Sequence, residues 1–259
     1  MSDKIFTNLT ALKQKLSTYR PLNPDELQKI RDMERTYHIH TSNALEGNTL
    51  TLYETRMILE TGVTISGKPL KEHLEVVNLA YAYDFVEEIA KGNQPLGERE
   101  LLEIHAMVYS KLGERNTVGR YRNVDVWITG SAHTPPSSFQ VRELMVDFFA
   151  WANQAIETLH PVQYAALLHE KLVTIHPFID GNGRTARLLL NFALIRHGYL
   201  PIYIKSDQES RQRYNKALEL AQTTGDTSAF VSLICERVEE KLQERLAILE
   251  QANQTHNIN

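Results

Sequence analysis

The chain has 259 residues, of which 28 are Lys or Arg and 32 are Asp or Glu, so its formal net charge at pH 7 is −4. Hydrophobic residues make up 42% and charged residues 23%, fractions typical of a globular protein with a buried core. A weakly negative chain lacks the extended basic face that nucleic acid requires, so we predict no nucleic-acid partner. A local basic pocket for a phosphate ligand remains compatible with this charge.

The single cysteine, Cys235, excludes a disulfide framework and any zinc site built on two or more cysteines. It lies in an apolar helical segment, which favours a buried structural thiol. The first residues lack the apolar core of a signal peptide, and no apolar run approaches the roughly 18 residues that span a membrane. These features predict a cytoplasmic protein with no membrane partner.

Helical periodicity covers most of the chain. An apolar stripe over residues 9–16 comes first, and Pro21 and Pro24 then break the chain. Asn23 or Asp25 is expected to cap the helix that follows. The helices predicted from here on cover residues 24–46, 52–60, 70–90, 98–112, 138–156, 161–175, 182–197, 207–223 and 227–252. The one at 70–90 carries an apolar stripe at Leu74, Val77, Tyr81, Phe85 and Ile89.

The pattern changes between residues 117 and 136, where β-forming residues alternate with chain breakers. The β-formers are Tyr121, Val124, Val126, Trp127 and Ile128, and the breakers are Gly119, Gly130 and the pair Pro135 and Pro136. This composition predicts one β-hairpin or a pair of short strands. The chain is therefore expected to be all-α with one small β insertion.

The residues best suited to chemistry lie in the stretch 176–187, which joins two predicted helices and reads His-Pro-Phe-Ile-Asp-Gly-Asn-Gly-Arg-Thr-Ala-Arg. Its Gly-Asn-Gly turn lets several N–H groups point into one concavity at the positive end of the next helix, which is a nest for phosphate oxygens. Arg184 and Arg187 lie three residues apart on the first helical turn, so both can reach one anion.

Two further residues complete this candidate site. Asp180 could hold a Mg²⁺ that bridges the phosphates, and His176 could accept a proton from an attacking hydroxyl. Each residue also has a structural interpretation, because a glycine turn can simply link two helices, arginines can face solvent and a histidine can end a helix. A base, a carboxylate, an anion nest and two arginines within one short stretch favour the functional interpretation.

This stretch resembles the signature of the Fic family, H-x-F-x-D/E-G-N-G-R-x-x-R, at every fixed position. The similarity extends from about His38 to about Ile234 and is closest to the animal-type Fic adenylyltransferases. It implies an all-α Fic fold, a helical bundle with a small β-hairpin flap. It also implies four segments: an N-terminal segment 1–22, a helical region with the inhibitory helix 23–95, a catalytic core 96–234, and a C-terminal helix and tail 235–259.

The resemblance further implies transfer of AMP from ATP to a Ser, Thr or Tyr hydroxyl of a protein, with release of pyrophosphate and with Mg²⁺ or Mn²⁺ as the metal. It makes His176 the general base, Phe178 a buried anchor and Asp180 the metal ligand. The nucleotide-binding residues that it implies in the signature are Asp180, Gly181, Asn182, Gly183, Arg184, Thr185 and Arg187. A kinase branch of the family has Lys in place of Gly183, so glycine favours AMP transfer.

A second motif lies upstream, where residues 42–47 resemble the family's inhibitory pattern S/T-x-x-x-E-G/N. By itself this segment is an ordinary helix end with a glycine stop. Beside the signature, Ser42, Glu46 and Gly47 are expected to inhibit the enzyme in cis. Glu46 would pair with Arg187 where the γ-phosphate belongs, so ATP would bind with misplaced phosphates. In some animal-type members this glutamate helps water to remove AMP, so a reverse de-AMPylation stays open.

Two further elements are assigned by resemblance. Segment 118–136 is similar to the family's flap, whose edge can pair with an extended segment of the protein substrate. Flap residues that could reach the nucleotide are Thr129, Gly130 and Ser131. The predicted helix 207–223 is similar to the helix that borders the adenine, where the corresponding residues are Tyr214, Asn215 and Gln222. The animal pattern has Tyr and Asn at the last two of these positions.

Other interpretations stay open. The chain could transfer another nucleotide or a phosphate-containing group, or it could be a non-catalytic ATP-binding regulatory module. The substrate protein cannot be read from the sequence and could be this chain itself, and a homodimer is one option. His160, His169 and His176 do not have the spacing of a helical zinc pair, so we predict no zinc site.

Overall fold

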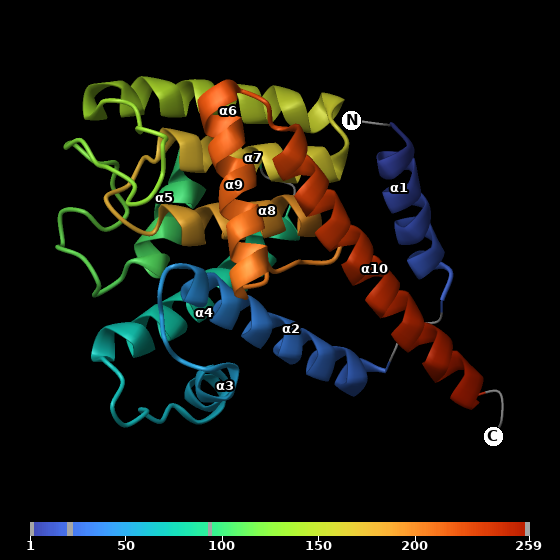
Figure 1. The fold of residues 1–259 in the computed structure, drawn as a ribbon. Helices are drawn as coiled ribbons and strands as arrows, with labels where there is room; N and C mark the ends of the chain where they lie inside the picture. Colours follow the sequence, from blue (N-terminus) through green and yellow to red (C-terminus); the bar gives the residue numbers. More distant parts are fainter. Residues whose placement is uncertain (1–2, 20–22, 93–94, 257–259) are drawn as a thin grey trace.

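The computed structural model describes residues 3–19, 23–92 and 95–256, and in these ranges it is all-α with no β-strand (Figure 1). The elements in chain order are α1 (Asp3–Ser17), α2 (Pro24–Leu45), α3 (Leu52–Thr61), α4 (Leu70–Ala90), α5 (Glu98–Val108), η1 (Ser138–Gln140), α6 (Val141–Thr158), α7 (Pro161–Ile175), α8 (Asn182–Arg196), α9 (Gln208–Thr224) and α10 (Ser228–His256). Every helix predicted from the periodicity is present, although α5 ends before the predicted residue 112.

Residues 1–2, 20–22, 93–94 and 257–259 lie outside the described residues, and with them the predicted chain break at Pro21 and the last residues of the predicted tail. Helix α10 runs without a break across the predicted boundary between residues 234 and 235.

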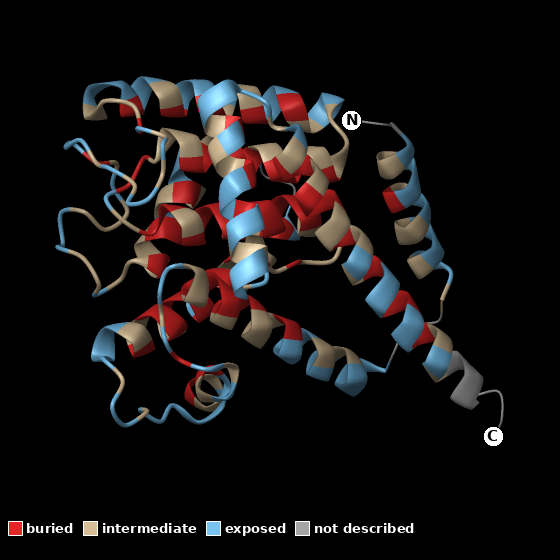
Figure 2. Cartoon of the chain, in the orientation of Figure 1, coloured by how far each residue is buried: buried red, intermediate tan, exposed pale blue. Residues whose placement is uncertain are grey.

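Helices α7 and α8 form the centre of the bundle, as the concentration of buried residues in Figure 2 shows. They pack against each other, α4 and α5 cover α8, and α6 and α10 cover α7. Helix α8 is buried around most of its circumference, its polar residues Asn182, Arg187 and Asn191 included, so neighbouring helices enclose it on all sides. This enclosure fixes the N-terminal end of α8, where the signature lies.

Local sequence signals explain where several helices begin and end. Asn23 caps α2, and its Oδ1 accepts the N–H of Glu26 at 2.9 Å. Thr51 and Glu54 form a capping box at the start of α3, and Gly62 ends that helix with a left-handed φ of 71°. These ends confirm the boundaries expected from the sequence to within a residue or two.

The β-hairpin predicted at 117–136 is absent, and this segment follows an irregular path (Figure 1). The guanidinium of Arg122 takes the carbonyls of Val124 and Pro136, at 3.0 and 2.5 Å, which a strand ladder would otherwise use. Val124 and Trp127 are 50% and 79% exposed, so no core covers the stretch around these two residues, whereas Tyr121 at its start packs against Phe178. Strand propensity needs such a covered face to be realised, and here it is missing.

The most deeply buried face of α4 is not its predicted apolar stripe, whose members Val77 and Phe85 are only partly buried. Tyr81, from that stripe, is 66% exposed, whereas Val76, Leu79 and Tyr83 are buried. Helix α4 thereby also buries the carboxylate of Glu75, which comes to lie beside the signature.

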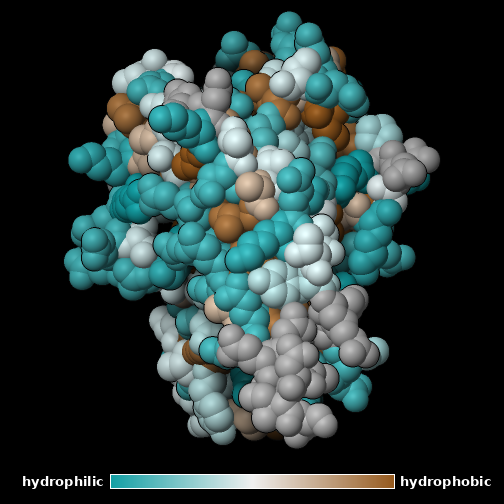
Figure 3. Space-filling view, turned by 90° about the vertical axis from the view of Figure 1, so that its right-hand side faces the viewer, coloured by the Kyte–Doolittle hydropathy of each residue, from teal (hydrophilic) through white to brown (hydrophobic). Residues whose placement is uncertain are grey.

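The N- and C-terminal helices pack together at the edge of the bundle, where Leu9 of α1 is fully buried. The face of the molecule that includes them is mostly hydrophilic, with only small hydrophobic spots (Figure 3). In the part of the chain that the structure describes, none of the helices combines the length and apolar character needed to cross a bilayer.

Candidate active site

The signature segment consists of a loop between α7 and α8 and of the first residues of α8. His176 ends α7 in a left-handed conformation with φ 52°, and Gly181 caps α8 with φ 80°. The side chain of Asn182 braces the loop, because its Oδ1 accepts the N–H of Phe178 and its Nδ2 donates to the Phe178 carbonyl, both at 2.9 Å. Phe178 is fully buried and stacks on His105 with ring centres 3.7 Å apart. These contacts hold the loop in place at the N-terminal end of α8, which is the positive end of the helix dipole.

A cleft of about 650 Å³ opens above this helix end. It is lined by the end of α2 (Leu45, Glu46), the flap (Ile128, Thr129, Gly130, Ser131), residues near the signature turn (Val173, His176, Gly183, Arg187) and α9 (Gln212, Tyr214, Asn215, Lys216, Leu218, Glu219, Gln222). The flap and α9 residues predicted to reach the nucleotide therefore share one cleft with His176. Arg184, Asn182 and Thr185 are buried outside this lining.

Glu46 projects from the end of α2 over the signature turn. Its Oε1 accepts a hydrogen bond from Nη2 of Arg187 at 2.6 Å, so the predicted ion pair is confirmed. Arg187 also donates from Nε to Oγ of Ser42 at 2.7 Å and from Nη2 to the Ser42 carbonyl at 2.9 Å. A Cβ atom placed on Gly183 would lie 2.3 Å from Oε1 of Glu46. The carboxylate therefore fills the space directly above the glycine of the turn.

His176 is a neutral imidazole at the wall of the cleft. Burial lowers its pKa, and the nearby Arg122 lowers it further, against the opposite effect of Glu46. Its Nδ1 lies 3.3 Å from the Val173 carbonyl, to which it donates a hydrogen bond, and this tautomer leaves Nε2 free to accept a proton. A neutral imidazole with a free nitrogen meets the requirement for a general base.

Asp180 lies at the mouth of the loop, with a side chain 44% exposed. The described residues contain no group of three or more His, Cys, Asp or Glu side chains that could hold a metal ion. Mg²⁺ is commonly held by one or two carboxylates together with phosphates and water. Asp180 therefore fits a metal ion that arrives with a triphosphate and takes most of its ligands from it.

Comparison with known proteins agrees with this geometry. The Fic/DOC family model matches residues 95–194. A solved structure of Fic-1 from C. elegans superposes with a TM-score of 0.86 and 30% sequence identity, covering 96% of this chain and 73% of that one. The chain belongs to the Fic/DOC family.

Two further relatives define the extent of the similarity. The protein adenylyltransferase Fic of Drosophila erecta is 41% identical over 208 residues, 79% of this chain and 40% of the fly protein. A Fic-domain signalling protein from Bacteroides thetaiotaomicron superposes with a TM-score of 0.84 and 28% identity, covering 95% of this chain and 98% of that one. The Fic chain described here spans less than half the length of its fly relative.

Tyr214 lines this Fic cleft and is at the same time largely buried against Arg187. It is 4% exposed, and its hydroxyl lies 2.9 Å from Nε2 of His169 and 3.5 Å from Nη1 of Arg187. Burial lowers the pKa of His169 well below its ordinary value, so that ring is neutral. This position suits Tyr214 for holding Arg187, and its contact with adenine stays a prediction.

Sequence reasoning missed the role of Arg122, which fastens the flap to the Fic loop. Its guanidinium is buried, and its Nε donates to the His176 carbonyl at 2.8 Å. Its backbone N–H donates to the Pro177 carbonyl, also at 2.8 Å. The bond that fastens the flap to the loop has no local sequence signature, because its acceptor, the His176 carbonyl, lies 54 residues from Arg122 in the chain.

His105 is a second missed residue. Its Nε2 donates to the Asp180 carbonyl at 3.0 Å, and its Nδ1 accepts the N–H of Gly119 at 3.1 Å. Burial lowers the pKa of His105 to about 4, in keeping with a neutral ring that uses both nitrogens. The one available signal was a polar residue on the apolar face of a predicted helix, beside Leu101 and Val108.

Buried histidines are expected to make this fold sensitive to acid. Burial lowers the pKa of His38 and of His105 to about 4, whereas histidine in an unfolded chain titrates near 6.5. Between these pH values the unfolded state binds more protons, so the free energy of unfolding falls as the pH falls. We expect a loss of up to about 2 kcal/mol per histidine between pH 7 and pH 5. Urea unfolding at both pH values measures it, and equal free energies would contradict it.

Proposed function

We propose that this chain is a protein adenylyltransferase. It transfers AMP from ATP to a Ser, Thr or Tyr hydroxyl of a protein, releases pyrophosphate, and is inhibited in cis by Glu46. The observation that carries the proposal is the carboxylate of Glu46 above Gly183 and beside Arg187, at the positive end of α8. A cradle of this kind suits a polyanion, and in this structure the chain's own acidic side chain fills it.

The chain's own residues would perform the transfer as follows. The N–H groups at the start of α8 and the guanidinium of Arg187 hold the phosphates once Glu46 has moved aside. His176 accepts the proton of the substrate hydroxyl through Nε2, which contributes about 10²–10⁴-fold in rate. Asp180 would hold Mg²⁺ or Mn²⁺, which neutralises charge on the phosphate oxygens.

The flap offers a docking site for the substrate protein. Residues 118–136 form no strand, and Trp127, which precedes the cleft-lining Ile128, is 79% exposed. An extended segment of the substrate can pair with this irregular backbone and bring its hydroxyl to His176. Several properties of the chain stay predictions. These are the modification of a substrate protein or of the chain itself, de-AMPylation, formation of a homodimer, a cytoplasmic location and use of a metal ion.

Transfer of differently labelled ATP tests the proposed reaction. The Glu46→Gly protein is incubated with Mg²⁺ and ATP labelled at either the α- or the γ-phosphate, and the modified residues are located by mass spectrometry. We expect label from the α-phosphate only. Label from the γ-phosphate would identify a kinase. If another nucleotide competes with ATP in the labelling reaction, the chain transfers a different group. ATP binding without any labelling would identify a regulatory module.

A further inference from the structure

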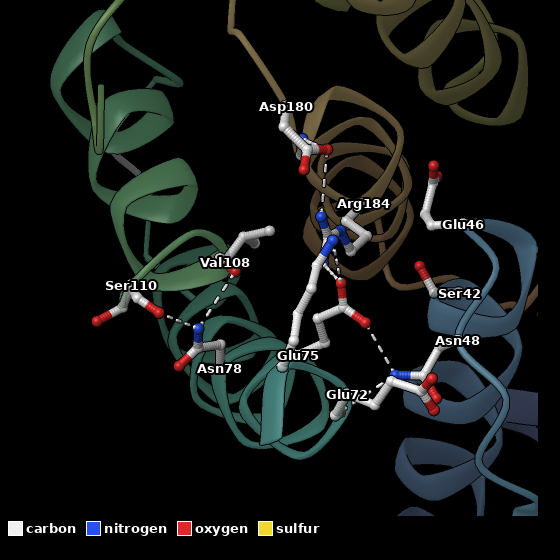
Figure 4. A network of polar contacts seen from close by, with 12 residues as sticks. Ser42, Glu46, Asn48, Glu72, Glu75, Asn78, Val108, Ser110, Asp180 and Arg184 are labelled. Atoms are coloured by element: carbon white, nitrogen blue, oxygen red, sulfur yellow. Dashed lines mark hydrogen bonds and ion pairs between the residues drawn. The ribbon is translucent and has the colours of Figure 1, made fainter. Parts of the chain in front are cut away.

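A buried carboxylate from outside the Fic signature contacts the first signature arginine. Nη1 of Arg184 lies 3.4 Å from Oε1 of Glu75, and its Nη2 lies 3.4 Å from Oδ1 of Asp180. The side chain of Glu75 is 8% exposed and comes from α4. Figure 4 shows Arg184 between these two carboxylates, one at the mouth of the loop and one beneath it.

These contacts leave the guanidinium of Arg184 incompletely satisfied. The residue is 2% exposed, and among the described residues its Nε and Nη1 have no hydrogen-bond partner, so the contact of Nη1 with Glu75 is an ion pair without hydrogen-bond alignment. A buried guanidinium is tolerated only with a close counter-ion. Asp180 is the candidate metal ligand, so Glu75 is the counter-ion that remains for Arg184 when Asp180 holds a metal.

Glu75 also reaches the segment that follows the inhibitory glutamate. Its Oε2 accepts a hydrogen bond from Nδ2 of Asn48 at 2.9 Å, and the same nitrogen donates to the Glu72 carbonyl at 3.1 Å (Figure 4). Asn48 stands two positions after Glu46 in the chain. The other cation near Glu75 is the exposed Lys71, with Nζ 3.8 Å from Oε1. One buried carboxylate thus joins the end of the inhibitory segment to the phosphate-binding turn.

We propose that Glu75 is a positioning residue for Arg184. It supplies the negative charge that holds the guanidinium in place when the carboxylate of Asp180 turns to the metal, so that Arg184 stays aligned behind the phosphate cradle. The proposal rests on the proposed function, since the expected ligand is ATP with its metal.

Substitution of Glu75 in the Glu46→Gly background tests this role through equilibrium binding. Binding of Mg²⁺–ATP and of adenosine is measured by calorimetry, without a substrate protein. Glu75→Gln is expected to weaken Mg²⁺–ATP binding about 10- to 100-fold, as loss of a supporting carboxylate commonly does, and to leave adenosine binding unchanged. Glu75→Asp, which keeps the charge, should recover part of the loss. In an Arg184→Lys background, Glu75→Gln should add little.

Glu72→Gln is the matched control, because Glu72 lies on the same helix and its carboxylate binds the N–H and hydroxyl of Thr49 instead of Arg184. It should bind Mg²⁺–ATP normally. Three outcomes would each overturn the proposal. One is an equal loss of affinity for ATP and for adenosine, the second is tighter ATP binding after loss of the Glu75 charge, and the third is the same loss of ATP affinity in Glu72→Gln. If Glu75→Gln does not fold, as thermal melting would show, unaltered binding in Glu75→Asp overturns it. Absence of AMP transfer with binding still dependent on Glu75 would refute the proposed function alone.

Discussion

Replacement of Glu46 by glycine is expected to raise the rate of AMP transfer at least about 100-fold. The Glu46 carboxylate lies 2.6 Å from Arg187 and directly above Gly183, where it would displace the phosphates that transfer requires. A misplacement of 1 Å can cost about 10²-fold in rate. Glycine removes the carboxylate, while the bonds from Arg187 to Ser42 remain. Incorporation of AMP into protein over time measures the change.

The isosteric Glu46→Gln variant separates charge from shape. It retains an acceptor for Arg187 but loses the negative charge that competes with phosphate, so we expect an intermediate rate. Glu46→Gly should also be less stable without nucleotide, since the buried Arg187 loses its counter-ion, and Mg²⁺–ATP should restore part of that stability. A rate for Glu46→Gly no higher than that of the unaltered protein would refute the inhibitory role.

Replacement of His176 by alanine in the activated protein is expected to lower AMP transfer about 10²–10⁴-fold. The expected loss follows from the free Nε2 of a neutral imidazole in the cleft wall. Below the pKa of His176 the ring is protonated and cannot accept the substrate proton. Because burial lowers that pKa, the acid limb of the pH–rate profile of Glu46→Gly should have its midpoint below pH 6.5, and it should vanish in the alanine variant.

Nucleotide binding distinguishes loss of the base from loss of the site. His176→Ala should still bind Mg²⁺–ATP when Glu46 is also replaced, since we expect the phosphates to contact α8 and Arg187 instead of His176. His197→Ala, at the opposite end of α8, should leave transfer unchanged. Transfer by His176→Ala at the activated rate would refute the base assignment.

The sequence by itself determined the helices and the local form of the signature. Periodicity and caps such as Asn23 and Gly62 act over a few residues, so they can be read without knowing what packs where. The signature is local for the same reason, because His176, Asp180 and Arg187 are placed by one helix end, one turn and one helix start. The pairing of Glu46 with Arg187 was predictable because residues 42–47 resemble the family's inhibitory pattern, which implies an arginine of the signature as the partner.

Only the tertiary structure decided the contacts that hold this turn in place. Glu75 contacts Arg184 because α4 turns a side toward the core that its apolar stripe did not indicate. Arg122 takes two carbonyls that a strand ladder would use, and Val124 and Trp127 stay exposed because no core covers them. Such partners are selected by burial, which makes each charged or polar group pair with whatever packing brings near it, and no short-range pattern encodes that choice.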